Sequence, residues 1–308
     1  MTHRLCRPLL GAGLWTALLH LPAGGCLHAQ GTPLPPQVDS LAAEAGAGDA
    51  ESQYRYGLVL ERGVGGVPVD YAAAADWYRR AVEQGHLGAM LSLSTLLLGS
   101  DPDEAIQLVV RAAELGSPEA QWRAGQVYAG RIFVPMSGIG QDRAAAIEWF
   151  TRAVEQGHHP SEEALADLYT ESGDPSEYGP GAELYRRSAE EGRSAWAALR
   201  MGMMYATGEG VEEDDAAALE WLSLLGTDGY ELNPDLFSNE DLEVLGGLQS
   251  YYGVDFTGRE GEVDRDEAAV AFRIALDALE LMPFRTFVHP SFGRASRRML
   301  DKLGAAPD

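Results

Sequence analysis

The chain has 308 residues, 45% of them hydrophobic, which is enough apolar material for one elongated array or two average domains. It carries 47 acidic against 23 basic residues, for a formal net charge of −24. So acidic a chain repels phosphate backbones and anionic lipid headgroups, which argues against nucleic-acid binding and against direct binding to membrane surfaces.

The first 29 residues have the pattern of a secretory signal peptide. Arg4 and Arg7 form a short positive region, residues 9–21 are mostly apolar, and small residues follow up to Ala29. The apolar stretch is too short for a comfortable membrane span. We therefore expect cleavage after Ala29 and a periplasmic or secreted mature protein. The alternative is an N-terminal core helix.

Both cysteines of the chain, Cys6 and Cys26, lie in this segment. Cleavage after Ala29 leaves a mature chain with no cysteine, and hence no disulfide or thiol chemistry. Residues 23–26 instead offer a weak match to a lipoprotein signal, in which Cys26 would carry a lipid anchor. We expect membrane attachment only if Cys26 is lipidated. Residues 30–40 begin with three prolines and a glycine and predict a linker.

An internal repeat follows the linker. Near copies read DYAAAADW from Asp70, DRAAAIEW from Asp142 and DDAAALEW from Asp214, so Trp77, Trp149 and Trp221 recur every 72 residues, or two units of about 36. An acidic residue is followed fifteen positions later by a glycine at Asp70/Gly85, Asp101/Gly116, Asp142/Gly157, Glu177/Gly192 and Asp214/Gly229. Asp is a preferred N-cap, alanine favours helix, and glycine suits the position after a helix end. Each frame therefore predicts a helix, which we name helix B.

A second helix, helix A, precedes these frames at residues 50–61, 119–129 and 195–206. Each of the three contains a glycine, namely Gly57, Gly125 and Gly202. An interior glycine costs a helix about 1 kcal/mol relative to alanine, so its recurrence indicates close approach of the partner helix. Glycine-rich turns follow at residues 63–67 and 208–211.

These features together resemble the Sel-1-like repeat, a relative of the tetratricopeptide repeat. The first unit carries the family pattern at Tyr54, Gly57, Gly63, Gly65, Val67, Asp70, Ala74, Trp77, Tyr78, Ala81, Gln84, Gly85 and His86. The resemblance covers residues 49–229. It departs in the second unit, which lacks the glycine turn, and in the fourth, which has Glu177 as its cap and Leu184 in place of tryptophan.

The resemblance implies an all-α, right-handed solenoid of stacked antiparallel helix pairs, with five to six repeats over residues 41–229. Residues 230–303 would then hold a degenerate sixth unit and a terminal capping helix. Gly247, Gly253, Asp266, Ala268 and Ala269 mark the sixth unit, and residues 290–303 form the capping helix. A stack needs a polar outer face at its ends, which such a helix provides.

Candidate sites of chemistry are few, and we assign no catalytic, cofactor-binding or metal-binding residue. His158/Glu162 and His159/Glu163 have helical ligand spacing but lack a third ligand, and His158 matches His86 of the first unit. The acidic run at residues 264–267 fits helix capping better than a calcium loop, which needs a central glycine and a distal acid. We expect the recurring tryptophans to be core residues and not a sugar-binding ladder, and Trp196, which is off the repeat frame, to make a surface contact.

The resemblance further implies a scaffold or adaptor that binds a protein partner on its concave face and needs no cofactor. The negative charge would suit a basic partner, and nucleic acid is not expected. Two alternatives stay open: a periplasmic inhibitor or immunity protein against a secreted toxin, and an outer-membrane lipoprotein that supports polysaccharide export. An enzyme is the least favoured class, because the hydrolase-like relatives are disulfide-rich and this chain is not.

Overall fold

The computed structural model describes residues 36–132, 140–192, 194–225, 239–252 and 290–304, with shorter pieces between 254 and 273. The elements in chain order are α1 (Pro36–Gly46), α2 (Ala50–Arg62), the short 3-10 helix η1 (Val64–Gly66), α3 (Tyr71–Glu83), α4 (Leu87–Leu97), α5 (Pro102–Glu114), α6 (Pro118–Tyr128), α7 (Arg143–Val154), α8 (His159–Glu171), α9 (Pro175–Gly192), α10 (Ala195–Thr207), α11 (Asp215–Ser223), α12 (Asn239–Tyr252), β1 (Val254–Asp255), β2 (Arg259–Glu260) and α14 (Pro290–Lys302).

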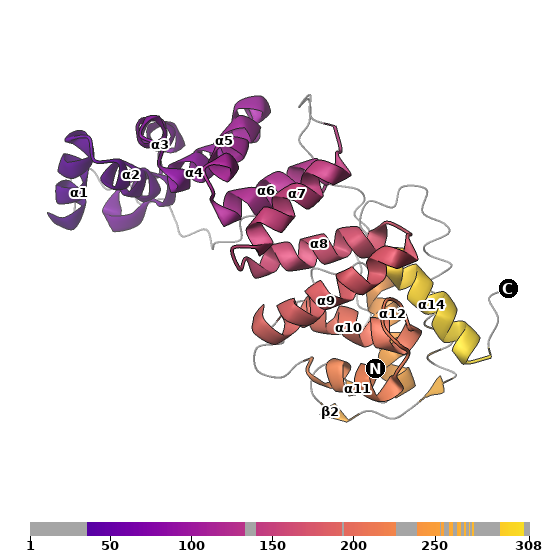
Figure 1. The fold of residues 1–308 in the computed structure, drawn as a ribbon. Helices are drawn as coiled ribbons and strands as arrows, with labels where there is room; N and C mark the ends of the chain where they lie inside the picture. Colours follow the sequence, from indigo (N-terminus) through magenta and orange to yellow (C-terminus); the bar gives the residue numbers. More distant parts are fainter. Residues whose placement is uncertain are drawn as a thin grey trace, which may run out of the picture.

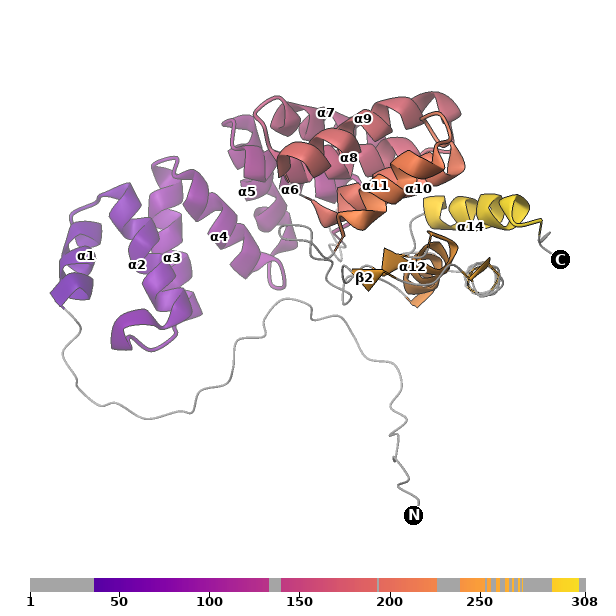
Figure 2. The same ribbon diagram turned by 90° about the horizontal axis from the view of Figure 1, so that it is seen from below.

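Consecutive helices pack side by side as pairs, and the pairs stack into an elongated, bent array (Figures 1 and 2). We number the pairs as units 1 to 5: α2–α3, α4–α5, α6–α7, α8–α9 and α10–α11. The expected solenoid of stacked helix pairs is confirmed. One element departs from the all-α expectation, because β1 and β2 form a two-residue antiparallel ladder. No helix of the described part is long and apolar enough to span a membrane.

The capping frame predicted from the sequence sets the start of helix B in most units. The carboxylates of Asp70, Asp101, Asp142 and Asp214 each accept from a backbone N–H of the first turn. This satisfies an amide that the helix itself leaves without a partner. Unit 4 is the exception: α9 begins at Pro175, so Glu177 lies within its first turn, and Asp174 accepts from the Ser176 N–H in its place.

The glycines inside helix A lie against helix B, as predicted. A Cβ on Gly57 would meet the Tyr78 ring at 2.5 Å, one on Gly125 would meet the Phe150 ring at 2.5 Å, and one on Gly202 would meet Leu222 at 2.7 Å. Each of these three large residues is wholly buried. The pairing of a small residue on one helix with a large one on its partner sets the separation within a unit.

The prediction that the recurring tryptophans are core residues is wrong by one position: in each unit the core position belongs to the residue after the tryptophan. Trp77, Trp149 and Trp221 are half-buried, and the next residue in each unit fills the core. The tryptophans cover the core edge, where Arg80 lies 4.4 Å from the Trp77 ring centre and Arg152 lies 4.8 Å from that of Trp149. Since successive helical residues are rotated by about 100°, a shift of one position moves a side chain from the edge to the centre of the interface.

The C-terminal part of the described chain holds α12 and the terminal helix α14. The Asp264 N–H donates to the Ser250 carbonyl, as the N–H of the capping Asp214 donates to the Tyr205 carbonyl, and Asp266 of the expected sixth unit lies outside the described residues. The predicted capping helix is α14, whose Ala295, Met299 and Leu300 are buried in the core cluster of units 4 and 5.

The expected signal peptide at residues 1–29 and its cysteines lie outside the described residues, and α1 already begins at Pro36, within the expected linker.

Candidate interaction surface

The edge where each A helix ends and its B helix begins carries a charged network, a cavity and the contacts of α14. We name it the A–B rim; its described residues are 62–71, 97–102, 128–132, 140–143, 171–175 and 207–215. Helix A presents carbonyl groups there without helical partners, and the helix dipole adds partial negative charge. The rim therefore attracts cationic side chains from other elements.

A charged network occupies the rim where units 3 and 4 meet. Arg131, which follows α6, donates to Asp167 at 2.9 Å and to Glu171 at 3.0 Å, both on α8. Burial alone would lower the pKa of Arg131, but the two carboxylates outweigh it and raise that pKa. Burial raises the pKa of Glu171 despite its arginine partner. These ion pairs fix the spacing between α6 and α8.

The network continues into the core of unit 4. The Tyr185 hydroxyl donates to Asp167, and the Trp196 indole N–H reaches the same carboxylate at 3.4 Å. Arg200 of α10, only 1% exposed, donates to the Tyr185 hydroxyl at 3.2 Å and to Thr170 at 3.4 Å. Trp196, expected to make a surface contact, is half-buried and belongs to this network.

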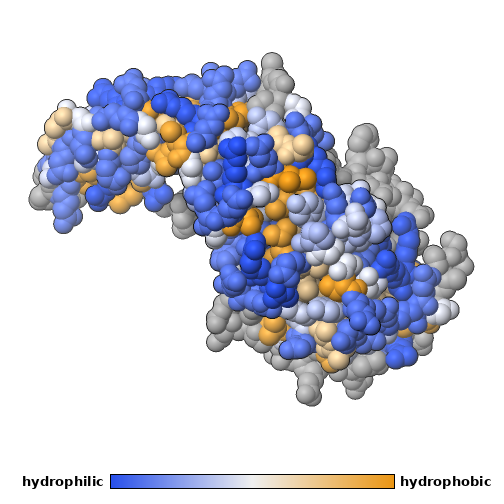
Figure 3. Space-filling view, in the orientation of Figure 1, coloured by the Kyte–Doolittle hydropathy of each residue, from blue (hydrophilic) through white to orange (hydrophobic). Residues whose placement is uncertain are grey.

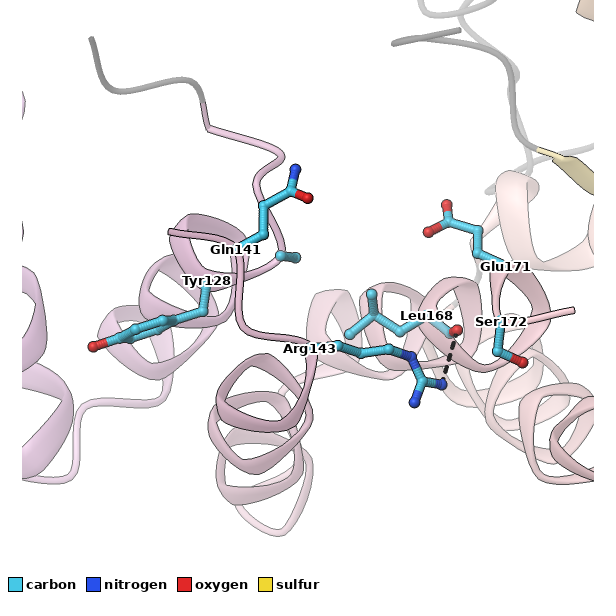
Figure 4. A pocket seen from close by; sticks show the side chains of 7 residues that line it. Tyr128, Gln141, Arg143, Leu168, Glu171 and Ser172 are labelled. Carbon is cyan, nitrogen blue, oxygen red and sulfur yellow. Dashed lines mark hydrogen bonds between the residues drawn. The ribbon is translucent and has the colours of Figure 1, made fainter. Parts of the chain in front are cut away.

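A cavity of about 240 Å³ opens beside the network. The residues that line it are Tyr128, Ala129, Gln141, Arg143, Leu168, Glu171 and Ser172. Figure 4 shows the Tyr128 and Gln141 side chains on the unit 3 side and Leu168, Glu171 and Ser172 on the unit 4 side. Arg143 lies between them, donating to the Leu168 carbonyl at 3.3 Å and to Glu177 at 2.5 Å. The lining combines apolar surface with charges of both signs, which suits an amphipathic side chain.

Helix α14 lies on the rim of units 4 and 5. Arg294 donates to Glu209 at 2.7 Å and to the Thr170 carbonyl at 2.9 Å. One turn later Arg298 donates to the Thr207 carbonyl, and Lys302 binds Asp215 at 2.6 Å. A basic stripe on one helix thus binds the carboxyl-terminal ends of two A helices and the acids beside them.

The histidine–acid pairs singled out from the sequence make different contacts. His158 faces Glu119 at 3.5 Å and Ser161 at 2.8 Å, whereas its expected partner Glu162 binds Arg187 and lies 3.1 Å from His159. Among the described residues no group of three His, Cys, Asp or Glu side chains is placed to hold a metal ion. His158 repeats the role of His86, which faces Glu51 at 2.9 Å.

The sequence interpretation missed the residues of the charged network, above all Arg131, Asp167 and Arg200. A signal was present in two of them. Arg200 interrupts an otherwise apolar helix, and Asp167 lies between Ala166 and Leu168, at a position whose neighbours are buried. A charged residue at core spacing in a repeat array indicates a buried ion pair, because an unpaired buried charge is too costly.

Comparison with known proteins bears on the whole array. The model of the Sel1 repeat family matches residues 50–86, 87–117, 118–158 and 197–230. A relative named "Uncharacterized protein NMB1327" from Neisseria meningitidis is 31% identical over 166 residues, which are 52% of this chain and 32% of that relative. The chitin synthase regulator SKT5 of Malassezia restricta is 30% identical over 135 residues, 42% of this chain and 9% of its own. The chain thus spans a third or less of these relatives.

Two solved structures share the fold. The protective antigen c5321 of uropathogenic Escherichia coli, described as having an SLR fold, superposes with a TM-score of 0.60 at 25% identity, covering 87% of this chain and 56% of that one. A Sel1 repeat protein from Oxalobacter formigenes has a TM-score of 0.54 at 21% identity, covering 74% and 85%. The family matches leave out residues 159–196, which hold α8 and α9, yet this pair stacks in line with the others. By repeat sequence and by architecture the chain is a Sel1 repeat protein whose fourth unit departs from the family pattern.

Proposed function

We propose that this chain is an exported scaffold that binds a protein partner at the A–B rim of units 3 and 4. Sel1 repeat proteins are protein-interaction scaffolds. The observation that carries the proposal is the cavity between Tyr128 and Ser172, because it lies at the junction with unit 4, which the family model does not match. Protein interfaces gain most of their affinity from a few side chains that enter such pockets.

The surface of the array supports a protein partner. On the face seen in Figure 3, hydrophilic side chains dominate and apolar ones gather over the middle of the array. Such a mixture is typical of interfaces with an apolar centre and a polar border. The net charge of −24 would speed association with a basic partner and make its binding salt-dependent.

The proposal assigns no catalysis to the site. The charged side chains of the network are engaged in ion pairs of Arg131 with α8 and in a hydrogen bond of Arg200 with Thr170. The raised pKa values of Arg131 and Glu171 have structural causes, so they are not by themselves signs of an active site.

Binding is tested by blocking the cavity. Ser172→Trp places a large ring at the cavity mouth, and Ser100→Trp is its matched control. Both serines are exposed residues of A–B turns whose hydroxyl donates to the carbonyl three positions earlier. In a pull-down from an envelope fraction, we expect the unchanged chain and Ser100→Trp to retain the same protein and Ser172→Trp to lose it. Equal retention by all three proteins would contradict the proposal.

Export is tested separately by mass spectrometry of the mature protein. A chain that begins at Gln30 supports signal cleavage, and an acylated Cys26 supports the lipoprotein alternative. An intact Met1 would contradict export and leave the binding proposal standing. The identity of the retained protein then distinguishes an adaptor from a toxin inhibitor.

A further inference from the structure

The A–B turns of units 1 and 5 share the anchor residue at each end, although the turn of unit 1 is one residue longer and contains η1. Helices α2 and α10 each end on a left-handed glycine, Gly63 with φ 65° and Gly208 with φ 66°. The following turns lead to the N-cap residues Asp70 and Asp214, whose side chains accept from the first turn of helix B. Positions next to these anchors are therefore equivalent in the two units.

The chemistry at three equivalent positions differs between the two units. After the glycine, unit 5 has Glu209 and unit 1 has Val64. Before the N-cap, Glu213 corresponds to Val69, and after it, Asp215 corresponds to Tyr71. The unit 1 residues are 54%, 51% and 55% exposed, which places them among the most exposed large hydrophobic residues of the described chain. We name these three residues the unit 1 patch.

In unit 5 the three acids hold a helix. Arg294 of α14 binds Glu209 at 2.7 Å, and Lys302 binds Glu213 at 2.9 Å and Asp215 at 2.6 Å. The same helix buries Met299 and Leu300 in the core. Within this chain, then, the A–B rim is a position at which a helix docks, and the side chains of the rim match the side chains of the helix.

We infer that the unit 1 patch is a docking site for the apolar face of an α-helix from a partner protein, in the position that α14 takes on unit 5. Val64, Val69 and Tyr71 replace the three acids that bind the basic stripe, so the matching helix carries apolar side chains at the corresponding positions. Three exposed apolar side chains on one rim of so acidic a chain indicate an interaction site, because apolar side chains that gather on a polar surface are typical of binding surfaces. This site is separate from the cavity of units 3 and 4 and does not depend on it.

The test uses a helical probe derived from α14. The probe is a labelled peptide of residues 290–302 with Arg294→Leu, Arg298→Leu and Lys302→Leu, held helical by a side-chain bridge between the exposed positions 297 and 301. Its affinity for the full chain is measured by fluorescence anisotropy. The peptide with its basic residues unchanged serves as the second probe.

Three proteins are compared: the unchanged chain, the variant Val64→Glu/Val69→Glu/Tyr71→Asp, and Leu115→Glu. The triple variant gives unit 1 the residues of unit 5. Leu115 is also 55% exposed but lies in the turn that joins α5 to α6, at the opposite edge of the array, and is the matched control.

We expect the apolar probe to bind the unchanged chain and Leu115→Glu equally, and the triple variant about tenfold more weakly or worse. The basic probe should show the reverse preference at low salt, binding the triple variant better than the unchanged chain. Single Val64→Glu should lie between, which guards against a folding defect in the triple variant. Equal binding of the apolar probe to the unchanged chain and the triple variant, or an equal loss in Leu115→Glu, would overturn the inference.

Discussion

Units 1 and 3 repeat the same polar contacts, whereas unit 4 replaces them. Gln84 donates to Gln53 at 2.8 Å in unit 1, and Gln156 donates to Gln121 at 2.7 Å in unit 3. A histidine follows each and faces a glutamate at the start of helix A. The glutamine bonds join the two helices of one unit, and each histidine links the start of the next helix A back to the start of this one.

In unit 4 the position of Gln53 and Gln121 is taken by Glu162, the fourth residue of α8. It is 2% exposed and binds Arg187 of α9 and His159. Other polar groups of α8 bind residues outside unit 4. Arg131 precedes α8 in the chain, and Trp196, Arg200 and Arg294 follow unit 4. The difference shows that ion pairs at unit 4 fix the position of neighbouring units, in addition to the packing that every unit uses.

The largest effect is expected at Arg200, because the comparison of the units predicts that unit 4 loses much of its stability without this buried charge. Arg200→Met removes a guanidinium bonded to Tyr185 and Thr170 beside the Asp167 carboxylate. Loss of one member of a buried ionic network should lower the free energy of unfolding by about 3 kcal/mol or more. Urea denaturation measures it. Arg186→Met, which breaks exposed ion pairs with Glu183 and Glu190, should cost about 1 kcal/mol or less; similar losses in both variants would contradict the account.

A smaller effect is expected at the small-to-large pairing that units 1, 3 and 5 share. In Gly125→Ala the new methyl group would lie 2.5 Å from the Phe150 ring. The clash should cost about 1–3 kcal/mol, more than the gain in helix propensity. Phe150→Leu in the same chain should recover part of the loss. Gly246→Ala in α12, where a Cβ meets nothing within 4 Å, should instead stabilise the protein in thermal unfolding.

The pH dependence of stability should have opposite signs in units 1 and 4. Burial raises the pKa of Glu163, so its charge disfavours the fold at neutral pH, and this penalty fades as the pH falls through the raised pKa toward the ordinary value of 4.5. Glu163→Gln should therefore be more stable than the unchanged chain at neutral pH and lose this advantage toward acidic pH.

The control for this pH effect is Asp49 at the start of α2. A hydrogen bond from the Ser52 backbone lowers its pKa, so its contribution is present above the ordinary value of 3.8 and is lost as the pH falls through the lowered pKa. Asp49→Asn should cost stability at neutral pH. Urea titrations over a range of pH measure both variants, and slopes of the same sign would contradict the assignment.

The smallest effect is expected at the edge tryptophans. Arg80→Gln and Arg152→Gln each remove a cation from the face of a half-buried tryptophan. Each should cost about 0.5–1 kcal/mol, and the two losses should be similar, because Arg152→Gln in addition breaks only an exposed ion pair with Glu148. Thermal unfolding of the two variants side by side measures this; clearly unequal losses would show that the units are less alike than their contacts indicate.

The sequence predicted the parts of the fold that local chemistry determines. Capping acids, helix-ending glycines and the glycines inside helix A each act within one helix or one pair. The sequence interpretation misplaced the core tryptophans, because two adjacent aromatic residues such as Trp77 and Tyr78 differ only in rotation about the helix axis. The structure decides that Tyr78 faces Gly57.

The candidate site was not predictable in the same way. Arg131 and Asp167 are 36 residues apart, and Arg294 and Thr170 are 124 apart. Such contacts depend on how units stack and on where the last helix returns, which a repeat pattern does not specify. The mismatch of unit 4 with the family pattern, visible at Glu177 and Leu184, and the charged residues Asp167 and Arg200 at core spacing were sequence signs that this region is special.

The central claim is that a protein partner binds at the cavity between units 3 and 4. The most direct measurement places a photoreactive amino acid at Ser172 and, in a second protein, at Ser100, and compares the crosslinks each forms in the envelope of the native host. The account predicts a specific crosslink from position 172 that weakens with salt, and none from position 100. Equal crosslinking from the two positions, or none from position 172, would contradict it.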